Sequence, residues 1–526
     1  MQAKILSAQE AVRLIPSGAT VCIGGGGAGH AVPDRIMQAL GEVFAEAGSP
    51  GNLTVIHPCG IGDAADRGLS HLARPGLIKR AVGGFWGNSL KMVELARTGQ
   101  IEAYNFPQGV LSHLTRAVAS GAPGVITRTG LHTFVDPRVE GGKLNQEATE
   151  DLVKLIEIEG NEYLFFPSPR IDVGLIRGSS IDCEGNLSME EEVGKFAMLS
   201  IAQAVKRNRG LVIAQVKRVR EQEHTPAYQV HVPAVFIDAV IVEPDQGMTF
   251  LSPWEPALIR RDADFEPESL TLTGIPRTVA KRAAEELSPG DFVNVGFGMA
   301  DGVPIVAQQE GVIDSLIFMI EQGAVGGIPT TGLNFGAMYQ PLGILDDGYQ
   351  FDYFHGGGLD IAFLGFAQID REGNVNSSKF GSHITGCGGF IDISQNARKV
   401  VFCGSFAVKG EVIMHGDRIE VTDPGKKRKF IQNVEQITFS GKYALERGQE
   451  VLYVTERAVF RLIPGGLRLE EIAPGVDLER DILAMMDFVP EIADDLKPMS
   501  PGFFSDQPLQ LRDRFKSRGT ERGDHG

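Results

Sequence analysis

Short runs of consecutive apolar residues recur along the chain and predict its strands. The clearest runs are residues 53–56, 210–214, 239–242, 315–320 and 399–402. Their apolar residues are mostly consecutive rather than at alternate positions, which is typical of strands buried on both faces of a parallel sheet. Residues 276–287 instead follow a helical pattern. The alternation of such strands and helices predicts an α/β fold with open sheets.

Two sets of matching segments indicate an internal duplication. In each half, a glycine precedes an apolar run, a glycine loop and then a proline, and an Asp-x-Glu-Gly-Asn segment comes later. The segments are Gly18-Ala-Thr-Val-Cys-Ile-Gly24 and Asp182-Cys-Glu-Gly-Asn186 in the first half, and Gly290-Asp-Phe-Val-Asn-Val-Gly296 and Asp370-Arg-Glu-Gly-Asn374 in the second. Because the order is the same in both halves, we predict two copies of one α/β unit.

The length of the chain also favours two domains. Its 526 residues exceed the roughly 250–300 at which a single core usually stops growing. We expect a first domain at residues 1–262, a charged linker at 263–274 and a second domain at 275–505. The polar residues 506–526 are expected to form a frayed tail.

Composition narrows the class of protein. The chain is 43% hydrophobic and 22% charged, as in globular proteins, and its net charge is −17. An acidic surface argues against nonspecific binding to nucleic acid or to a membrane surface. The five cysteines form no Cys-x-x-Cys pair, so neither a disulfide framework nor a zinc site is indicated. With no signal-like start and no apolar run of about 18 residues, we expect a cytoplasmic protein.

The glycine loop Gly24-Gly-Gly-Gly-Ala-Gly29 matches the dinucleotide pattern Gly-x-Gly-x-x-Gly. That fingerprint also requires an acidic residue at the end of the next strand. The next predicted strand ends at His57 instead, which disfavours a nicotinamide site. Two interpretations remain, a loop whose N–H groups face another anion or an oxyanion, and a purely structural turn. The first would make Gly25, Gly26 and Gly27 site residues.

The strongest chemical signal is Glu321. It ends the apolar run 315–320 and is followed at once by Gly323, Gly326 and Gly327. Ligands of open α/β sheets bind beyond the carboxyl ends of strands, and a partly desolvated carboxylate there is a better nucleophile or base. Glycines beside it would leave room for substrate. The alternative interpretation is that Glu321 caps a turn or pairs with a surface cation.

Other catalytic signatures do not occur. The sequence has no His-x-x-x-His pair beside a Glu, no Gly-x-Ser-x-Gly elbow and no Walker lysine. These gaps count against a zinc peptidase, a serine hydrolase and a P-loop NTPase.

At these residues the chain resembles the family I CoA-transferases, which include short-chain acyl-CoA:acetate and 3-oxoacid CoA-transferases. It looks most like the single-chain acetate/propionate branch, in which both halves are fused. The most specific segment, Glu321-Gln-Gly-Ala-Val-Gly-Gly-Ile-Pro, is similar to the family's Glu-x-Gly signature. The other similar segments are Thr127-Arg-Thr-Gly130, Gly141-Gly142, Asp182 to Asn186, Val295-Gly-Phe-Gly298, Asp370 to Asn374 and Gly388-Gly-Phe-Ile-Asp392.

The resemblance implies a mechanism and a set of site residues. Glu321 would attack the acyl-CoA carbonyl and carry an acyl-glutamyl anhydride and then a glutamyl-CoA thioester, in ping-pong catalysis without a metal or a bound cofactor. The loops with Gly25, Gly26 and Gly27 and with Gly326 and Gly327 would form an oxyanion hole. Family positions near the CoA chain match Gly296, Phe297, Gly298, Met299, Ala300, Gly388 and Gly389.

The resemblance further implies an active site between the two related domains and a homo-oligomer, either a dimer or a tetramer. Its substrates would be coenzyme A esters and short carboxylates, with neither nucleic acid nor membrane as partner. An acyl-CoA hydrolase on the same fold and a non-catalytic ligand-binding protein are the alternatives. The subgroup and the acyl preference stay open, because Gln322 stands where 3-oxoacid enzymes often have Asn. The acceptor and the residues that hold the CoA phosphates and adenine also stay open.

Overall fold

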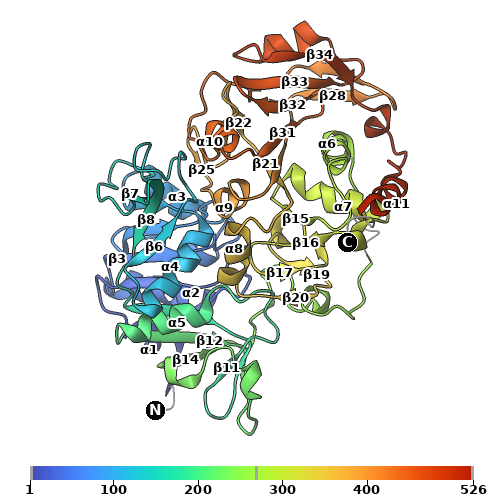
Figure 1. Ribbon diagram of the computed structural model, residues 1–526. Helices are drawn as coiled ribbons and strands as arrows, with labels where there is room; N and C mark the ends of the chain where they lie inside the picture. Colours follow the sequence, from blue (N-terminus) through green and yellow to red (C-terminus); the bar gives the residue numbers. More distant parts are fainter. Residues whose placement is uncertain (1–3, 267–270, 523–526) are drawn as a thin grey trace.

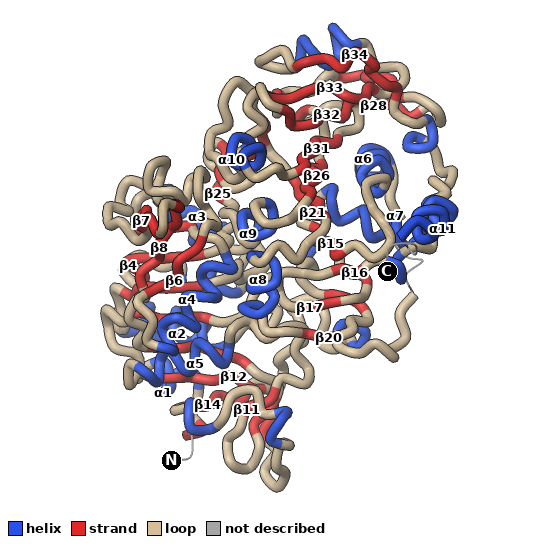
Figure 2. Tube along the Cα trace, in the orientation of Figure 1, coloured by secondary structure: helices blue, strands red, loops and turns tan. Residues whose placement is uncertain are grey.

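The computed structural model describes residues 4–266 and 271–522. Two eight-stranded sheets organise the chain, one in the blue-to-green first half and one in the yellow-to-red second half (Figure 1). Loops and the short helices between the sheets fill the region where the halves meet (Figure 2). The fold is therefore α/β with two open sheets.

The first sheet is parallel throughout. Its strands lie in the order β1 (Lys4–Ile5), β14 (Ala239–Val242), β12 (Leu211–Val216), β9 (Val173–Arg177), β2 (Thr20–Ile23), β3 (Leu53–His57), β4 (Ile78–Gly83) and β5 (Glu102–Asn105). One face packs against α1 (Ala8–Val12), α2 (Asp34–Ala47) and α3 (Leu90–Arg97), and the other against α4 (Gln108–Ser120) and α5 (Met198–Arg207). Burial on both faces explains the continuous apolar runs.

The second sheet begins with five parallel strands and ends in a hairpin region. The order is β16 (Ile317–Phe318), β15 (Phe292–Val295), β21 (Ile361–Gly365), β26 (Lys399–Cys403), β31 (Glu450–Val454), β32 (Ala458–Ile463), β33 (Gly466–Ile472) and β34 (Glu491–Pro498). Its helices are α6 (Gly274–Ala284), α7 (Gly302–Gln309) and α11 (Leu511–Arg522) on one face, and α8 (Asp347–His355), α9 (Phe390–Ser394) and α10 (Gly441–Glu446) on the other.

Smaller sheets decorate both halves. The first half adds β6 (Gly124–Thr127), β7 (Lys154–Ile158) and β8 (Asn161–Pro167) as one sheet, and β10 (Ser180–Ile181), β11 (Leu187–Ser188) and β13 (Arg218–Val219) as another. The second half adds the pairs β17 (Ala324–Val325) with β20 (Gly343–Ile344), β18 (Ile328–Pro329) with β19 (Met338–Tyr339), β22 (Gln368–Ile369) with β23 (Val375–Asn376), β24 (Lys379–Phe380) with β25 (His383–Ile384), β27 (Ala407–Val408) with β30 (Lys427–Arg428), and β28 (Glu411–Met414) with β29 (Ile419–Asp423).

Most predicted elements are present within a few residues of their expected ends. The runs at 53–56, 210–214, 239–242 and 399–402 form β3, β12, β14 and β26, and the pattern at 276–287 forms α6. The run at 315–320 keeps only β16, because residues 313–315 form a 3-10 turn and Gly323 N–H closes a turn onto Ile320 O at 2.9 Å. That turn places Glu321 directly beyond a sheet edge.

The predicted duplication is confirmed in the hydrogen bonding of the two sheets. At the start of β2, Thr20 N–H donates to Asp172 Oδ2 at 3.1 Å, and at the start of β15, Phe292 N–H donates to Asp360 Oδ2 at 3.0 Å. Thr20 and Phe292 are related by the same shift as Gly18 and Gly290. In each half, the aspartate directly precedes the strand that pairs with the glycine-flanked one, β9 or β21.

The two Asp-x-Glu-Gly-Asn segments also fold alike. Asp182 Oδ1 accepts hydrogen bonds from the N–H groups two and four residues later, at 3.0 and 2.9 Å, and Asp370 Oδ1 accepts the equivalent pair at 3.1 and 3.0 Å. Each second oxygen accepts from the asparagine side chain, Asn186 or Asn374. The fourth residue is glycine in both because its φ is positive, +89° and +77°.

The structure differs from the expectation that residues 506–526 form a frayed tail. Residues 511–522 form helix α11 rather than a frayed end, and Leu511 and Phe515 are buried in the core under α6 and α7. These two side chains are four residues apart and therefore share one helix face. The high polarity of the surrounding positions concealed that pair. The predicted linker at 263–274 lies partly outside the described residues, since residues 267–270 are not among them.

Backbone and side-chain groups of α4 connect the two halves. Gly109 N–H donates to Asp392 Oδ2 at 3.1 Å, Ser112 Oγ donates to Asp347 Oδ2 at 2.7 Å, and Arg116 pairs with Asp352 at 2.7 Å. Within residues 4–266 and 271–522, every helix is too short or too polar to cross a bilayer.

Candidate active site

Glu321 lies in the turn after β16, where glycine is sterically required. Gly323 has φ +109°, and a Cβ there would lie 2.2 Å from Leu345 O. A side chain at that position would therefore displace the backbone next to Glu321. Glu321 itself is 8% exposed, so the turn presents its carboxylate to an interior space rather than to bulk water.

The environment of Glu321 favours its neutral form. Gln322 Nε2 donates to Oε1 at 3.2 Å, whereas Oε2 is buried without a partner among the described residues. Burial raises the pKa of Glu321 above its ordinary value, and the negative charge of Asp392 adds to the rise. Hydrogen bonds with its own backbone, Gln322 and Asn294 oppose it. The site thus holds a desolvated carboxylate with one oxygen available to a substrate.

The glycine loop of the first half reaches this carboxylate through Cys59. A Cβ on Gly26 would lie 2.6 Å from both Cys59 Sγ and Phe196 Cε1, so the loop packs directly on these side chains. Cys59 lies near Gln322 and Glu321, and both act on the pKa of its thiol. Burial raises the pKa of the Cys59 thiol to about 12, which keeps it neutral. Segments from both halves therefore enclose Glu321.

The N–H groups of the predicted oxyanion loops have different fates. Gly26 N–H donates to His30 O at 2.9 Å, and Gly326 N–H donates to Phe318 O at 2.8 Å, so neither is free in this structure. Gly27 N–H interacts with the Cys59 thiol. Gly326 and Gly327 pack against Leu342 and Tyr339 of the neighbouring hairpins. A Cβ on residue 25 would lie 2.7 Å from Ala31 O, so the close approach of the backbone requires glycine at this position.

Gly389 lies closer to the carboxylate than the resemblance implied. A Cβ on Gly389 would lie 3.2 Å from Glu321 Cγ. The preceding Gly388 connects the halves, because its N–H donates to Gly84 O at 2.8 Å and its carbonyl accepts from Gln108 N–H at 2.9 Å. The Gly388–Gly389 pair therefore forms a wall of the Glu321 space.

The segment 296–300 leaves this space toward the surface. Gly296 N–H donates to Phe363 O at 2.7 Å and ends β15, and Gly298 has φ +104° with open space on the side where a Cβ would point. Phe297 is 64% exposed, with its ring 5.7 Å from that of Phe335. Met299 is half-buried and Ala300 is buried. An exposed aromatic side chain on a glycine turn gives a ligand an apolar surface to lie on.

Two amides that sequence reasoning missed lie at the same place. Asn294 on β15 interacts with Glu321 and leaves its Oδ1 buried and unpartnered among the described residues. Gln108 opens α4 next to Gly388, and its Nε2 is likewise buried and unpartnered there. An asparagine inside an otherwise apolar strand was the available signal for Asn294. Nothing in the local pattern singles out Gln108, Cys59 or Phe196.

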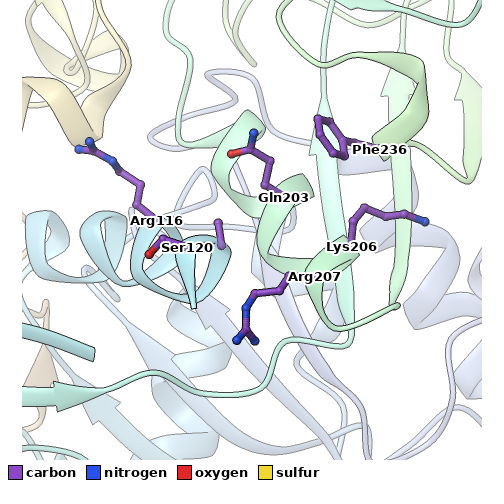
Figure 3. A pocket seen from close by; sticks show the side chains of 7 residues that line it. Arg116, Ser120, Gln203, Lys206, Arg207 and Phe236 are labelled. Carbon is purple, nitrogen blue, oxygen red and sulfur yellow. The ribbon is translucent and has the colours of Figure 1, made fainter. Parts of the chain in front are cut away.

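A cavity with basic side chains in its lining lies elsewhere. Its volume is about 580 Å³, and Arg116, Ala119, Ser120, Gln203, Lys206, Arg207 and Phe236 line it between α4 and α5 (Figure 3). The labelled arginine and lysine side chains point in different directions, and Arg116 and Lys206 are already paired with Asp352 and Asp238. Among residues 4–266 and 271–522, no cluster of three or more His, Cys, Asp or Glu side chains is arranged to hold a metal ion.

Comparison with known proteins gives this geometry a family. The family model for coenzyme A transferase matches residues 5–243. The acetate CoA-transferase YdiF of Escherichia coli (strain K12) is 44% identical, over 96% of this chain and 96% of its own. The caffeate CoA-transferase of Acetobacterium woodii is 43% identical, over 96% and 98%.

A solved structure agrees over the same length. The structure of YdiF from Escherichia coli O157:H7, described as a thioester complex with CoA, superposes with a TM-score of 0.92 at 42% identity and covers 97% of each chain. Whole-chain similarity at this level extends across both sheets and the space between them. The chain is therefore a CoA-transferase of family I, in which the two related α/β halves are fused in a single polypeptide.

Proposed function

We propose that this enzyme moves coenzyme A from a short-chain acyl-CoA to a carboxylate such as acetate, with Glu321 as the nucleophile. The observation that carries the proposal is the buried Glu321 carboxylate, whose Oε2 has no partner among the described residues and whose pKa is raised by burial. A carboxylate with poor solvation is a stronger nucleophile than one in water. The similarity to an acetate CoA-transferase supports acetate as one acceptor.

The proposed reaction proceeds in balanced covalent steps. Glu321 Oε2 attacks the thioester carbonyl and expels the CoA thiolate, giving an acyl-glutamyl anhydride. The thiolate then attacks the glutamyl carbonyl and releases the acyl group as a free carboxylate, leaving a glutamyl-CoA thioester. A second carboxylate reverses these steps and leaves as its CoA ester. Coenzyme A is thus a substrate, and no permanently bound cofactor takes part.

Donors near Glu321 would stabilise the oxyanion of each tetrahedral intermediate. The amide of Gln108 is the side-chain candidate, since its Nε2 is a buried donor without a partner among the described residues, whereas Asn294 Nδ2 already donates to Met319 O at 2.8 Å. One well-placed donor is worth about 10²–10³ in rate. The backbone of Gly25, Gly27 and Gly389 remains a further candidate, while Gly26 and Gly326 would first have to give up their present acceptors.

The test pairs transfer with hydrolysis in one assay. The enzyme, acetyl-CoA and propionate should yield propionyl-CoA and acetate with no net free thiol. After incubation with acetyl-CoA alone, intact-protein mass spectrometry should show an adduct of CoA mass. Peptide mass analysis after digestion should place it on the peptide that contains Glu321. Thiol release without a new CoA ester would indicate an acyl-CoA hydrolase instead, and neither product would indicate a binding protein. The expected cytoplasmic location and the dimer or tetramer remain predictions, the latter open to light scattering.

A further inference from the structure

A second buried carboxylate, Asp392, follows Gly389 by three residues and lies close enough to Glu321 for its charge to act on it. Asp392 is 0% exposed and lies on α9, which begins directly after Gly389. Since a Cβ on Gly389 would lie 3.2 Å from Glu321 Cγ, the first turn of α9 is packed against Glu321. Neither the reaction scheme above nor the glycine signature gives Asp392 a role.

Two hydrogen bonds fix the position of the Asp392 carboxylate. Oδ2 accepts from Gly109 N–H of α4 at 3.1 Å, and Oδ1 lies 2.8 Å from His355 Nε2 of α8. A Cβ on Gly109 would lie 2.6 Å from Oδ1 and from Phe351, so the first half is packed tightly over this pair. Contacts from α4 and α8 therefore fix the Asp392 carboxylate in place.

The other titratable groups near the pair are histidines, thiols and aspartic acids. On the Asp392 side these are His355, the buried thiol of Cys387 and, beyond His355, the ring of His113 at 5.0 Å, which pairs with Asp352 at 2.9 Å. On the Glu321 side they are the thiol of Cys59 and, near that thiol, Asp347. Burial raises the pKa of Asp347 well above its usual range, which favours its uncharged form.

We infer that Asp392 is a positioning residue that drives formation of the glutamyl-CoA thioester by destabilising the free Glu321 carboxylate. The inference rests on the proposed function. The step is Glu321 carboxylate plus acyl-CoA giving Glu321-CoA thioester plus free carboxylate, so one negative charge leaves the buried site for water. Repulsion between two buried anions exists only on the left side of this equilibrium. Asp392 thereby shifts the balance toward the covalent enzyme.

The inference makes two quantities change together. Protonation of Glu321 and its conversion to a thioester both remove the same charge next to Asp392. If the charge of Asp392 is deleted, the pKa of Glu321 and the logarithm of the thioester equilibrium constant should fall by the same amount. We expect about one pH unit and about tenfold, an interaction of ordinary size for two partly screened buried charges. A loosened active site would instead slow the reaction without this equality.

The experiment compares wild type with Asp392→Asn, which keeps the shape and can still accept from Gly109 N–H. Each enzyme is equilibrated with set ratios of acetyl-CoA to acetate, and the CoA adduct is measured by intact mass. The acid limb of the single-turnover rate of adduct formation gives the pKa of Glu321. Asp352→Asn is the matched control, because it removes a half-exposed aspartate from the same domain contact and should change neither quantity.

The outcomes separate this inference from the proposed function. Equal shifts of the acid limb and of the equilibrium constant in Asp392→Asn support it. An unshifted equilibrium constant or acid limb, even with slower turnover, overturns it while Glu321 catalysis stands. A wild-type enzyme that forms no CoA adduct overturns the proposed function itself. If Asp392→Asn does not fold by circular dichroism, Asp392→Ser, which is smaller and also neutral, takes its place with the same expected shifts.

Discussion

At the scale of single residues, reactivity and stability oppose each other at Glu321. The side chain is buried, and burial raises its pKa above the ordinary value. A carboxylate kept from water in this way reacts more readily, but its charge destabilises the fold. The glycines at 323 and 389 make this position possible, since a Cβ on either one would displace Glu321 or its turn.

Substitution of Glu321 tests its role as nucleophile. Glu321→Gln should abolish transfer, because the amide does not attack the thioester. Glu321→Asp withdraws the carboxylate by about 1.5 Å and should reduce transfer by at least ~10²-fold, with weak thiol release where a water enters the gap. Both are measured as acyl transfer and free thiol in parallel. A freshly purified Gln variant, checked by mass for deamidation, that transfers at the wild-type rate would refute the role.

The same variant has a predictable effect on stability. The folded pKa of Glu321 is raised above its unfolded value, so the group favours folding in its protonated form and disfavours it once ionised. Glu321→Gln should therefore increase the free energy of unfolding at pH 7. The gain should shrink as pH falls and be gone below pH 4.5, the ordinary pKa of a glutamic acid side chain. Urea denaturation of both proteins from pH 4 to pH 8 measures it, and a gain independent of pH would contradict the assignment.

The first-half loop offers a steric test. Gly26→Ala puts a Cβ at 2.6 Å from Cys59 Sγ and Phe196 Cε1, so one of these side chains beside Gln322 must move. We expect transfer to fall by at least ~10²-fold, because misplacement by about 1 Å costs that much. Gly343→Ala is the control, since its Cβ would meet no atom within 4 Å. Equal activity in both variants would make the loop a turn without influence on the site.

At the scale of elements, position along the strands explains where the chemistry gathers. Glu321 follows β16, Asn294 is on β15, and Cys59 lies just after β3. In both halves these are the carboxyl ends of parallel strands, which leave a sheet at one edge. Helix α4 of the first half then packs against α8 and α9 of the second, with Gly109, Ser112 and Arg116 as donors.

Helix α11 was not predicted, because most of its residues are polar. Its buried side chains can be tested by single substitutions. Phe515→Ala should lower the free energy of unfolding by about 3–5 kcal/mol, because it empties a buried aromatic site under α6 and α7. Lys516→Ala, next in sequence and 72% exposed, should change it by less than about 0.5 kcal/mol. Thermal and urea unfolding measure both. Equal stability of the two variants would mean that α11 is not part of the core.

At the scale of the whole molecule, two similar halves divide the work. The second supplies Glu321, Asn294, Gly389 and Asp392, and the first supplies Cys59, Gln108 and the loop with Gly26. The proposed active site lies where the two halves meet. Contacts across the boundary include backbone and side-chain hydrogen bonds, such as Gly130 N–H to Gln395 Oε1 at 2.7 Å and Phe134 N–H to Ile437 O at 2.7 Å.

The proposed domain boundary can be tested by dividing the chain. Residues 1–262 and 275–526, coexpressed as separate polypeptides, should copurify and transfer CoA, because each contains one complete sheet and α4 still finds its partners. A cut after residue 380 is the control, since it separates β21 from β26, which are neighbours in one sheet. Failure of the first pair to assemble, with each half folded, would show that the connection at 263–274 is needed.

The sequence by itself determined most strands and helices, the duplication and the position of Glu321 after a strand. Apolar runs, paired glycines and the Asp-x-Glu-Gly-Asn segments act over short distances, so their consequences can be read locally. Only the tertiary structure decided which distant side chains meet Glu321, which loop N–H groups are already engaged, and that Asp392 is buried beside it. These depend on packing between the halves, and residues such as Cys59 and Gln108 are separated from Glu321 by more than 200 positions along the chain.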